Sequence, residues 1–291
     1  MRPFFCCILL VAGMLTAPVS KAQFFSPFIL SGKADKLASG DLSFLTPDLR
    51  AGRLEASVSY GRWLPEQLPY GSVQAGGFLA LQERFGVRLE YRNNAFTAFD
   101  AFDAQGNVAG TVKPSEQRIL AGIALRLQEN VFFDVNGKYL TSFVGPDSRT
   151  EAFAGDVSVS YSKEGLTLGV KGADLGSKYT MDRHSWALPM RVLAGGSYRR
   201  DIADKHSVTA GADIGYILPK EYGTFTAAAG AQYTYDGMFF ARAGGHYSSA
   251  VAPRFVALGA GIAYQGIAID AAYLFGPVCN AWTLSLRFTR Q

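Results

Sequence analysis

The feature that most constrains this chain is a strict alternation of apolar and polar side chains, clearest over residues 116–140. In the first half of this segment the apolar positions are Ile119, Ala121, Ile123, Leu125 and Leu127. A polar run at residues 128–130 interrupts the pattern, which resumes over residues 131–139. A period of two predicts strands, and the short polar interruption predicts a hairpin turn. Such a hairpin suits a soluble sandwich, where the apolar face points inward, or an outer-membrane barrel, where that face meets lipid.

The N-terminal residues indicate an exported protein. Arg2 precedes an apolar run over residues 4–15, and Ser20 and Ala22 are small residues at the two positions that determine cleavage. We therefore interpret residues 1–22 as a signal peptide and exclude them from the fold. The remaining chain has no apolar stretch near the ~20 residues that a membrane-spanning helix needs. Any membrane span must therefore consist of strands.

The alternation divides the mature chain into two parts. Residues 23–52 lack it and contain Pro27 and Pro47, which predicts an N-terminal arm or a small plug in the periplasm. Over residues 53–291 it recurs in about fourteen segments, an even number in the range of bacterial barrels. We expect strands near residues 53–63, 70–82, 85–94, 115–128, 131–142, 151–162, 166–175, 190–200, 206–217, 223–235, 238–247, 254–264, 267–275 and 281–290. The last of these would close an antiparallel barrel against the first.

The connections between these segments alternate in length. Tight turns are expected at residues 82–84, 128–130, 162–165, 235–237 and 264–266, and long connections at residues 94–114, 143–150 and 176–189. Short turns at one rim and long loops at the other are typical of outer-membrane barrels. With a periplasmic N-terminus, the long loops lie outside the cell.

The charged positions of the strands share one face, which in a barrel is the interior. The predicted interior charge network consists of Arg88, Glu90, Arg118, Arg126, Asp134, Lys138, Asp156, Lys171, Arg242 and Arg287. The same face carries Glu55, Arg92, Glu116, Arg191, Asp213 and Asp270. Because both signs are interspersed, we expect pairing across a filled or narrow interior instead of a wide ion-selective pore.

The sequence offers almost no catalytic or metal-binding chemistry. His184, His206 and His246 are far apart and belong to no zinc or protease motif. Cys279 is the only cysteine of the mature chain, so no disulfide framework is expected, and it is interpreted as an incidental thiol. The net charge of +4 is spread without a Lys/Arg run, which gives nucleic-acid binding little support. We expect no enzymatic activity, no cofactor and no metal.

Two of the expected outer connections carry aromatic residues. The first opens with Trp63, Leu64 and Pro65, where Trp63 is either an anchor at the membrane interface or part of a partner surface. The second, residues 94–114, is too long for a turn, and its aromatic residues are Phe96, Phe99 and Phe102. Long ordered loops are usually functional, and exposed aromatics suit protein contact. We therefore expect both connections to bind partner proteins.

Several short segments in order resemble the PorV/PorQ family, the FadL-like outer-membrane components of the type IX secretion system of Bacteroidota. The segments are residues 59–65, 103–107, 113–116, 154–156 with Tyr161, 188–191, 230–235, 241–244 and 258–264. The resemblance covers nearly all of residues 53–288. It implies a fourteen-stranded barrel without enzymatic activity in the outer membrane of a Gram-negative cell.

The best-known member of that family is a shuttle, which the resemblance extends to this chain as an expectation. It implies that outer loops bind secreted proteins through their C-terminal signal domains, and that the partners are the translocon and the surface sortase or attachment subunits. The family usually carries a longer glycine-rich arm ending in Asn-Pro-Ala, whereas here only residues 45–49 stand in a comparable place.

A second hypothesis, from a different class, is a FadL-like transporter for hydrophobic small molecules. An apolar pocket under the N-terminal arm, ending at a strand kink that opens sideways, would favour transport. An interior packed with paired charges would favour the shuttle. A purely structural barrel is the third possibility.

Overall fold

The computed structural model describes residues 49, 52–65, 69–102, 107–143, 149–176, 179–181, 184–186, 188–218, 223–249, 254–277 and 279–290. The predicted signal peptide and nearly all of the predicted N-terminal arm lie outside these residues. None of the described residues belongs to a helix long and apolar enough to cross a bilayer.

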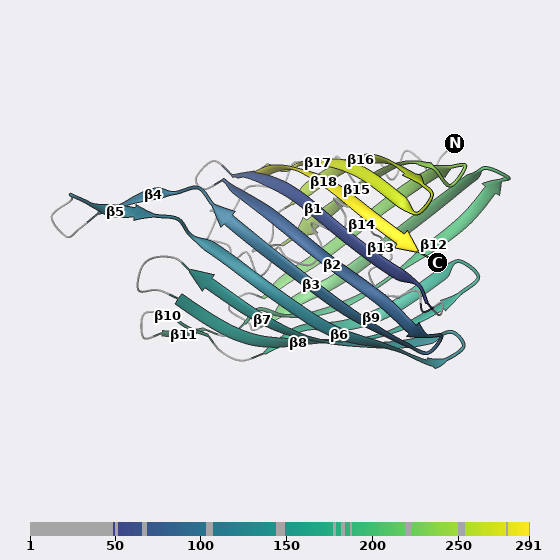
Figure 1. The fold of residues 1–291 in the computed structure, drawn as a ribbon, viewed down its shortest axis with the longest axis horizontal. Helices are drawn as coiled ribbons and strands as arrows, with labels where there is room; N and C mark the ends of the chain where they lie inside the picture. Colours follow the sequence, from purple (N-terminus) through teal and green to yellow (C-terminus); the bar gives the residue numbers. More distant parts are fainter. Residues whose placement is uncertain are drawn as a thin grey trace.

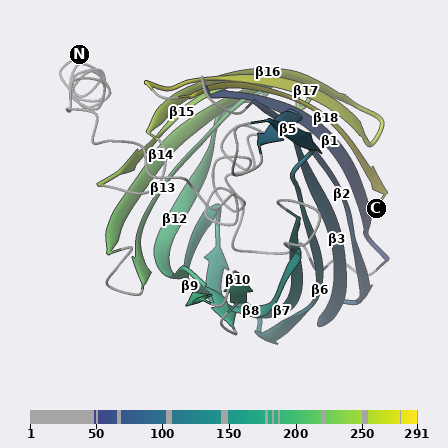
Figure 2. The same ribbon diagram turned by 90° about the vertical axis from the view of Figure 1, so that its left-hand side faces the viewer.

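Fourteen antiparallel strands form a closed barrel (Figures 1 and 2). They are β1 (Leu54–Pro65), β2 (Tyr70–Gln82), β3 (Phe85–Phe96), β6 (Ser115–Gln128), β7 (Val131–Phe143), β8 (Arg149–Lys163), β9 (Leu166–Gly176), β12 (Met190–Ala203), β13 (His206–Leu218), β14 (Thr224–Tyr235), β15 (Phe239–Ser248), β16 (Phe255–Tyr264), β17 (Ile267–Phe275) and β18 (Cys279–Arg290). The barrel closes where β1 pairs with β18, from Leu54 opposite Arg290 to Pro65 opposite Cys279. The predicted fold class and closure are confirmed.

Two small hairpins belong to long connections at the same end of the barrel. One pairs β4 (Phe99–Phe102) with β5 (Val108–Val112), and the other pairs β10 (Tyr179–Met181) with β11 (His184–Trp186). The β4–β5 hairpin projects well beyond the barrel rim in Figure 1. The sequence pattern did not predict these strands, because they are short and lie inside connections interpreted as loops.

At the opposite end, backbone geometry explains the tight turns. Glu164, Asp236 and Gln265 have positive φ angles of 50°, 54° and 48°, and each precedes a glycine whose φ is also positive. Two consecutive residues with positive φ form the type I′ turn, whose twist matches that of a two-stranded antiparallel ladder. The X-Gly pairs in the sequence therefore determine where these hairpins reverse.

The outer wall is apolar and is flanked by aromatic residues near both rims. The exposed aromatics toward the long connections include Tyr60, Tyr216, Phe225, Phe275 and Trp282, and those toward the tight turns include Tyr161, Tyr198, Tyr233, Tyr264 and Phe288. The exposed side chains between them include Val170, Ile214, Leu258, Ile269 and Leu284. An aliphatic band between two aromatic girdles is the surface that a bilayer requires of a barrel.

Candidate functional site

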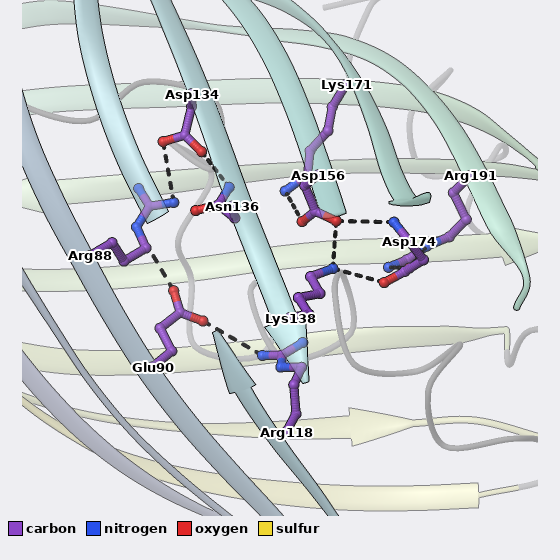
Figure 3. A network of polar contacts seen from close by, with 10 residues as sticks. All are labelled: Arg88, Glu90, Arg118, Asp134, Asn136, Lys138, Asp156, Lys171, Asp174 and Arg191. Atoms are coloured by element: carbon purple, nitrogen blue, oxygen red, sulfur yellow. Dashed lines mark hydrogen bonds and ion pairs between the residues drawn. The ribbon is translucent and has the colours of Figure 1, made fainter. Parts of the chain in front are cut away.

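The interior of the barrel carries a charge network on the wall formed by β3, β6 and β7 (Figure 3). Arg88 lies between two carboxylates, with its Nη1 3.5 Å from Asp134 Oδ2 and its Nε 3.9 Å from Glu90 Oε1. The other oxygen of Glu90 is 3.6 Å from Arg118 Nη2. Asn136 donates a hydrogen bond to Asp134. This first group links three adjacent strands and balances its charges internally.

A second group on β7, β8, β9 and β12 is more deeply buried. Lys138 Nζ lies 2.6 Å from Asp156 Oδ1 and 2.7 Å from Asp174 Oδ1. Lys171 Nζ lies 3.0 Å from the other oxygen of Asp156, and Arg191 Nε donates to Asp174 at 2.9 Å. The side chains of Lys138 and Asp156 are each 3% exposed. Three cations thus share two carboxylates, and every member has a partner of opposite charge.

Asp174 enters this group because of a bulge in β9. The register between β8 and β9 shifts between Gly155 and Val157, and Asp174 has a φ of 56°. Its amide donates to Asp156 Oδ1 at 3.0 Å, so the extra backbone group of the bulge is satisfied. Aspartate tolerates positive φ better than most residues.

Asp174 is absent from the network predicted above because alternation from Lys171 assigns it to the outward face. A carboxylate on the lipid side of a membrane strand is costly. That violation was the signal in the sequence, since a one-residue bulge turns the side chain inward.

On the opposite wall, Arg242 of β15 and Asp270 of β17 form a buried ion pair. Arg242 Nη2 is 2.6 Å from Asp270 Oδ1, and both side chains are at most 5% exposed. The strand between them, β16, places Gly259 opposite Arg242. A Cβ at Gly259 would lie only 2.9 Å from Arg242 Nε. The glycine therefore leaves the space in which the arginine crosses β16.

Two other members of the predicted network have different surroundings. The guanidinium of Arg126 lies over the ring of Phe132, with its Cζ 5.4 Å from the ring centroid. Arg287 is half-buried on the same face of β18 as Thr283. No ion pair within 4.0 Å joins either arginine to another described residue. The structure thus brings Arg88, Glu90, Arg118 and Asp134 into one group and Lys138, Asp156 and Lys171 into another.

The residues predicted to bind partners are divided between the interior and the outer rim. The Trp63 ring is 3% exposed and stacks on Tyr70 at a centroid distance of 5.9 Å, and Tyr70 contacts Phe96 at 4.9 Å. Trp63 is therefore not an exposed interface anchor. Side chains of β1 alternate between the two faces of the wall, and those at odd-numbered positions, including Trp63, face the interior. Leu64 and Phe99 are 41% and 43% exposed.

The side chains of Pro65, Phe102 and Cys279 lie outside the described part of the chain, as do residues 66–68 and 103–106. Partner binding by the two connections stays a prediction.

The lipid-facing wall contains a hollow of about 650 Å³ on β8, β9, β12 and β13. Its lining includes Val159, Leu168, Val170, Ala194, Ala212 and Ile214. The hollow arises where β12 and β13 place the small side chains Ala194 and Ala212 beside larger aliphatic ones. It is an apolar depression partly lined by β9, the strand that carries the bulge. Within the described ranges, no three His, Cys, Asp or Glu side chains are grouped so that they could hold a metal ion.

These features define the class of protein: a closed fourteen-stranded barrel of the outer-membrane type, with an apolar wall and an interior braced by ion pairs. No family model matches the chain, and no curated protein matches it either. Solved structures with the same fold include FadL-type barrels. The Ralstonia pickettii toluene transporter TbuX is 11% identical with a TM-score of 0.56, over 82% of this chain and 89% of TbuX.

Two further solved structures share this barrel fold. The CymD monoaromatic hydrocarbon channel is 13% identical with a TM-score of 0.55, over 89% of this chain and 93% of CymD. A Pseudomonas aeruginosa FadL homologue is 12% identical with a TM-score of 0.51, over 85% of this chain and 96% of the homologue. This chain therefore shares the barrel fold of these structures along most of its length.

Proposed function

We propose that this protein is an outer-membrane transporter for hydrophobic small molecules. The observation that carries the proposal is the apolar hollow on the lipid side of the wall, which β9 lines on the tight-turn side of its bulge. A hydrophobic molecule gains little from an aqueous exit, because it would have to re-expose its apolar surface to water. An apolar hollow on the outer wall offers it a place to bind on the membrane side instead. The fold shared with barrels described as hydrocarbon channels supports the same function.

The test is uptake by a Gram-negative host that lacks its own channel for hydrophobic compounds. Cells that produce this barrel should take up radiolabelled toluene or oleate faster than cells with an empty vector, and unlabelled compound should compete. A matched control is a host that produces an unrelated outer-membrane barrel to the same level. Uptake no faster than in that control, for both compounds, would exclude this function.

A second function, a partner-binding subunit of type IX secretion, is favoured by the projecting β4–β5 hairpin. Phe99 is 43% exposed on β4, and Val108 is 60% exposed on β5. A two-stranded sheet with apolar side chains is rarely stable by itself, so a partner that covers it would stabilise it. The ion pairs that fill much of one interior wall also suit a barrel that acts through its loops. The proposed partners are secreted proteins with C-terminal signal domains and the translocon or attachment subunits.

Crosslinking in native outer membranes, followed by purification and mass spectrometry, tests this second function. The informative variant replaces the hairpin, residues 99–112, by a short Gly/Ser turn. Phe96 is retained because it packs on Tyr70 inside the barrel. We expect the variant to keep its barrel and to lose the crosslinked secretion proteins, and Phe99→Ser to lose part of them. Recovery of the same proteins with and without the hairpin would contradict the assignment of this surface.

A further inference from the structure

Three basic residues, Arg199, Arg200 and Lys205, lie where β12 ends and turns into β13, at the tight-turn rim of the barrel (Figure 1). Two of them are paired with acids. Arg199 Nε lies 3.7 Å from Asp201 Oδ1, and Lys205 Nζ lies 3.1 Å from Asp236 Oδ2. No ion pair within 4.0 Å joins Arg200 to another residue of the described ranges. Its positive charge is therefore not balanced by that part of the chain.

Arg200 lies on the outer face of the wall, at the level of the aromatic girdle. Tyr198, two positions earlier on β12, shares its face and is 50% exposed. Val208 of β13 pairs with Arg200 on one side and with Tyr233 of β14 on the other. Directly paired residues of a ladder point to the same face, so Arg200 and the exposed Tyr233 both point toward the membrane. A long basic side chain at this level reaches the lipid headgroups.

A histidine stands beside Arg200 on the same face. His206 is two residues from Val208, which makes it a diagonal neighbour of Arg200, at a spacing of about 7–8 Å that long side chains bridge. The Nδ1 atom of His206 is 2.6 Å from the Tyr233 hydroxyl oxygen. This hydrogen bond orients the ring and leaves Nε2 for another partner. A guanidinium, an imidazole and a phenol hydroxyl thus converge at the membrane surface, a set of groups that suits an oxyanion.

On the side away from the tight turns, this part of the wall carries short side chains, which we call the alanine face. Its exposed residues are ladder neighbours on β13, β14 and β15, namely Ala210, Ala212, Ala229, Ala231 and Ala243. Ala212 also lines the apolar hollow. Short side chains allow an apolar chain to approach the backbone of the wall closely. The alanine face begins next to Tyr198 and Tyr233, so it continues from the polar groups into the apolar band.

We propose that Arg200, His206 and Tyr233 bind the phosphate of an anionic phospholipid, whose acyl chains lie on the alanine face. The tight turns mark the periplasmic rim, where the leaflet consists of phospholipid. A guanidinium binds phosphate through two parallel hydrogen bonds. The lipid is anionic because Arg200 lacks a countercharge, whereas an ethanolamine headgroup brings a cation of its own. This inference is independent of the proposed transport function, since no transported molecule takes part in it.

The test is native mass spectrometry of the mature barrel in detergent micelles. The protein is titrated with dioleoyl phosphatidylglycerol and, separately, with dioleoyl phosphatidylethanolamine, and the bound fraction gives each dissociation constant. We expect phosphatidylglycerol to bind about fivefold more tightly, which is the contribution of one basic residue near an anionic lipid. Arg200→Gln should lower the affinity for phosphatidylglycerol to that for phosphatidylethanolamine.

The matched control is Arg199→Gln, which makes the same change in net charge one residue away. Because Arg199 pairs with Asp201 at an exposed position, this variant should bind phosphatidylglycerol as tightly as the parent. Barrel formation is checked by the mobility difference between heated and unheated samples. If Arg200→Gln does not refold, His206→Gln takes its place and should also bind phosphatidylglycerol more weakly than the parent.

Free phosphate and a second copy of the chain are the competing occupants. Inorganic phosphate in excess over the lipid should not displace phosphatidylglycerol, because the ion has no acyl chains for the alanine face. Displacement by phosphate, or dimers in place of lipid adducts, would overturn the lipid site. An unchanged affinity in Arg200→Gln, or an equal loss in Arg199→Gln, would overturn it as well.

Discussion

Asp156→Ala should be among the most destabilising single substitutions in this barrel. The Asp156 carboxylate is 3% exposed and binds Lys138 at 2.6 Å, Lys171 at 3.0 Å and the Asp174 amide at 3.0 Å. Its removal leaves two lysines and Arg191 with Asp174 as the only carboxylate of the group. Removal of one partner from a buried ion pair costs about 3–5 kcal/mol, because the remaining charge stays desolvated. We expect the free energy of unfolding to fall by that amount.

The measurement is urea-induced unfolding of the barrel in phosphatidylcholine vesicles, followed by tryptophan fluorescence. Glu151→Ala is the matched control, because Glu151 lies on the same strand and pairs with Arg149 at 2.9 Å, but both side chains are at least 47% exposed. An exposed pair contributes about 0–1 kcal/mol, so this control should barely shift the transition. Two variants with the same midpoint would refute the reasoning.

A double variant separates charge balance from simple loss of contacts. Asp156→Ala with Lys171→Met removes one cation together with the carboxylate and restores the original net charge of the group. Residues in one ion-pair network couple by about 0.5–3 kcal/mol, so the double variant should be more stable than Asp156→Ala alone. A double variant less stable than the single one would show that the contacts matter and the charge balance does not.

Two further predictions test the wall and the opposite ion pair. Val170→Arg, on the lipid face between the two aromatic girdles, should cost about 2–4 kcal/mol and impair assembly more than Lys171→Ala, which folding yields into vesicles will show. Equal yields would contradict the facing of β9. Gly259→Ala should lower the free energy of unfolding by about 1–3 kcal/mol, because the added Cβ would meet Arg242 at 2.9 Å, in a wall with little room to adjust. Gly137→Ala is the control in the same urea titration, since the nearest atom to its added Cβ would be 3.9 Å away. A similar fall in the free energy of unfolding for both variants would argue that Arg242 does not cross β16 at Gly259.

Most of the fold could be predicted from the sequence because one physical rule governs it. A strand in a barrel wall must alternate, and the tight turns require glycine after a residue that tolerates positive φ, as Glu164-Gly165 shows. Both signals are local, so the order of the strands and the closure of β1 on β18 follow from the pattern. The short strands β4, β5, β10 and β11 carry too few residues for an alternation to be visible.

The interior partners could not be predicted to the same degree. Alternation places Lys138 and Asp156 on one face, but which carboxylate a lysine reaches depends on register and on the position of the bulge. Trp63 shows the same limit, since its place near a loop suggests an outer surface, whereas the parity of β1 points its ring inward onto Tyr70. A local pattern gives the face of a residue and leaves its neighbours undetermined.

The placement of the ion pairs also shows how the interior charges act on the wall. Elsewhere in the barrel, backbone ladders already hold the strands together, and interior charges such as Arg242 and Asp270 add bracing across strands that are paired in any case. Between β9 and β12 the backbone ladder runs as far as Ala173 and Arg191, and Arg191 also binds Asp174, so backbone and side-chain contacts join the two strands at the same level. The ion pairs therefore brace a wall that backbone ladders already close. Bracing of this kind is compatible with a transporter and with a barrel that acts through its loops, so uptake of a hydrophobic compound and crosslinking at the β4–β5 hairpin are informative together.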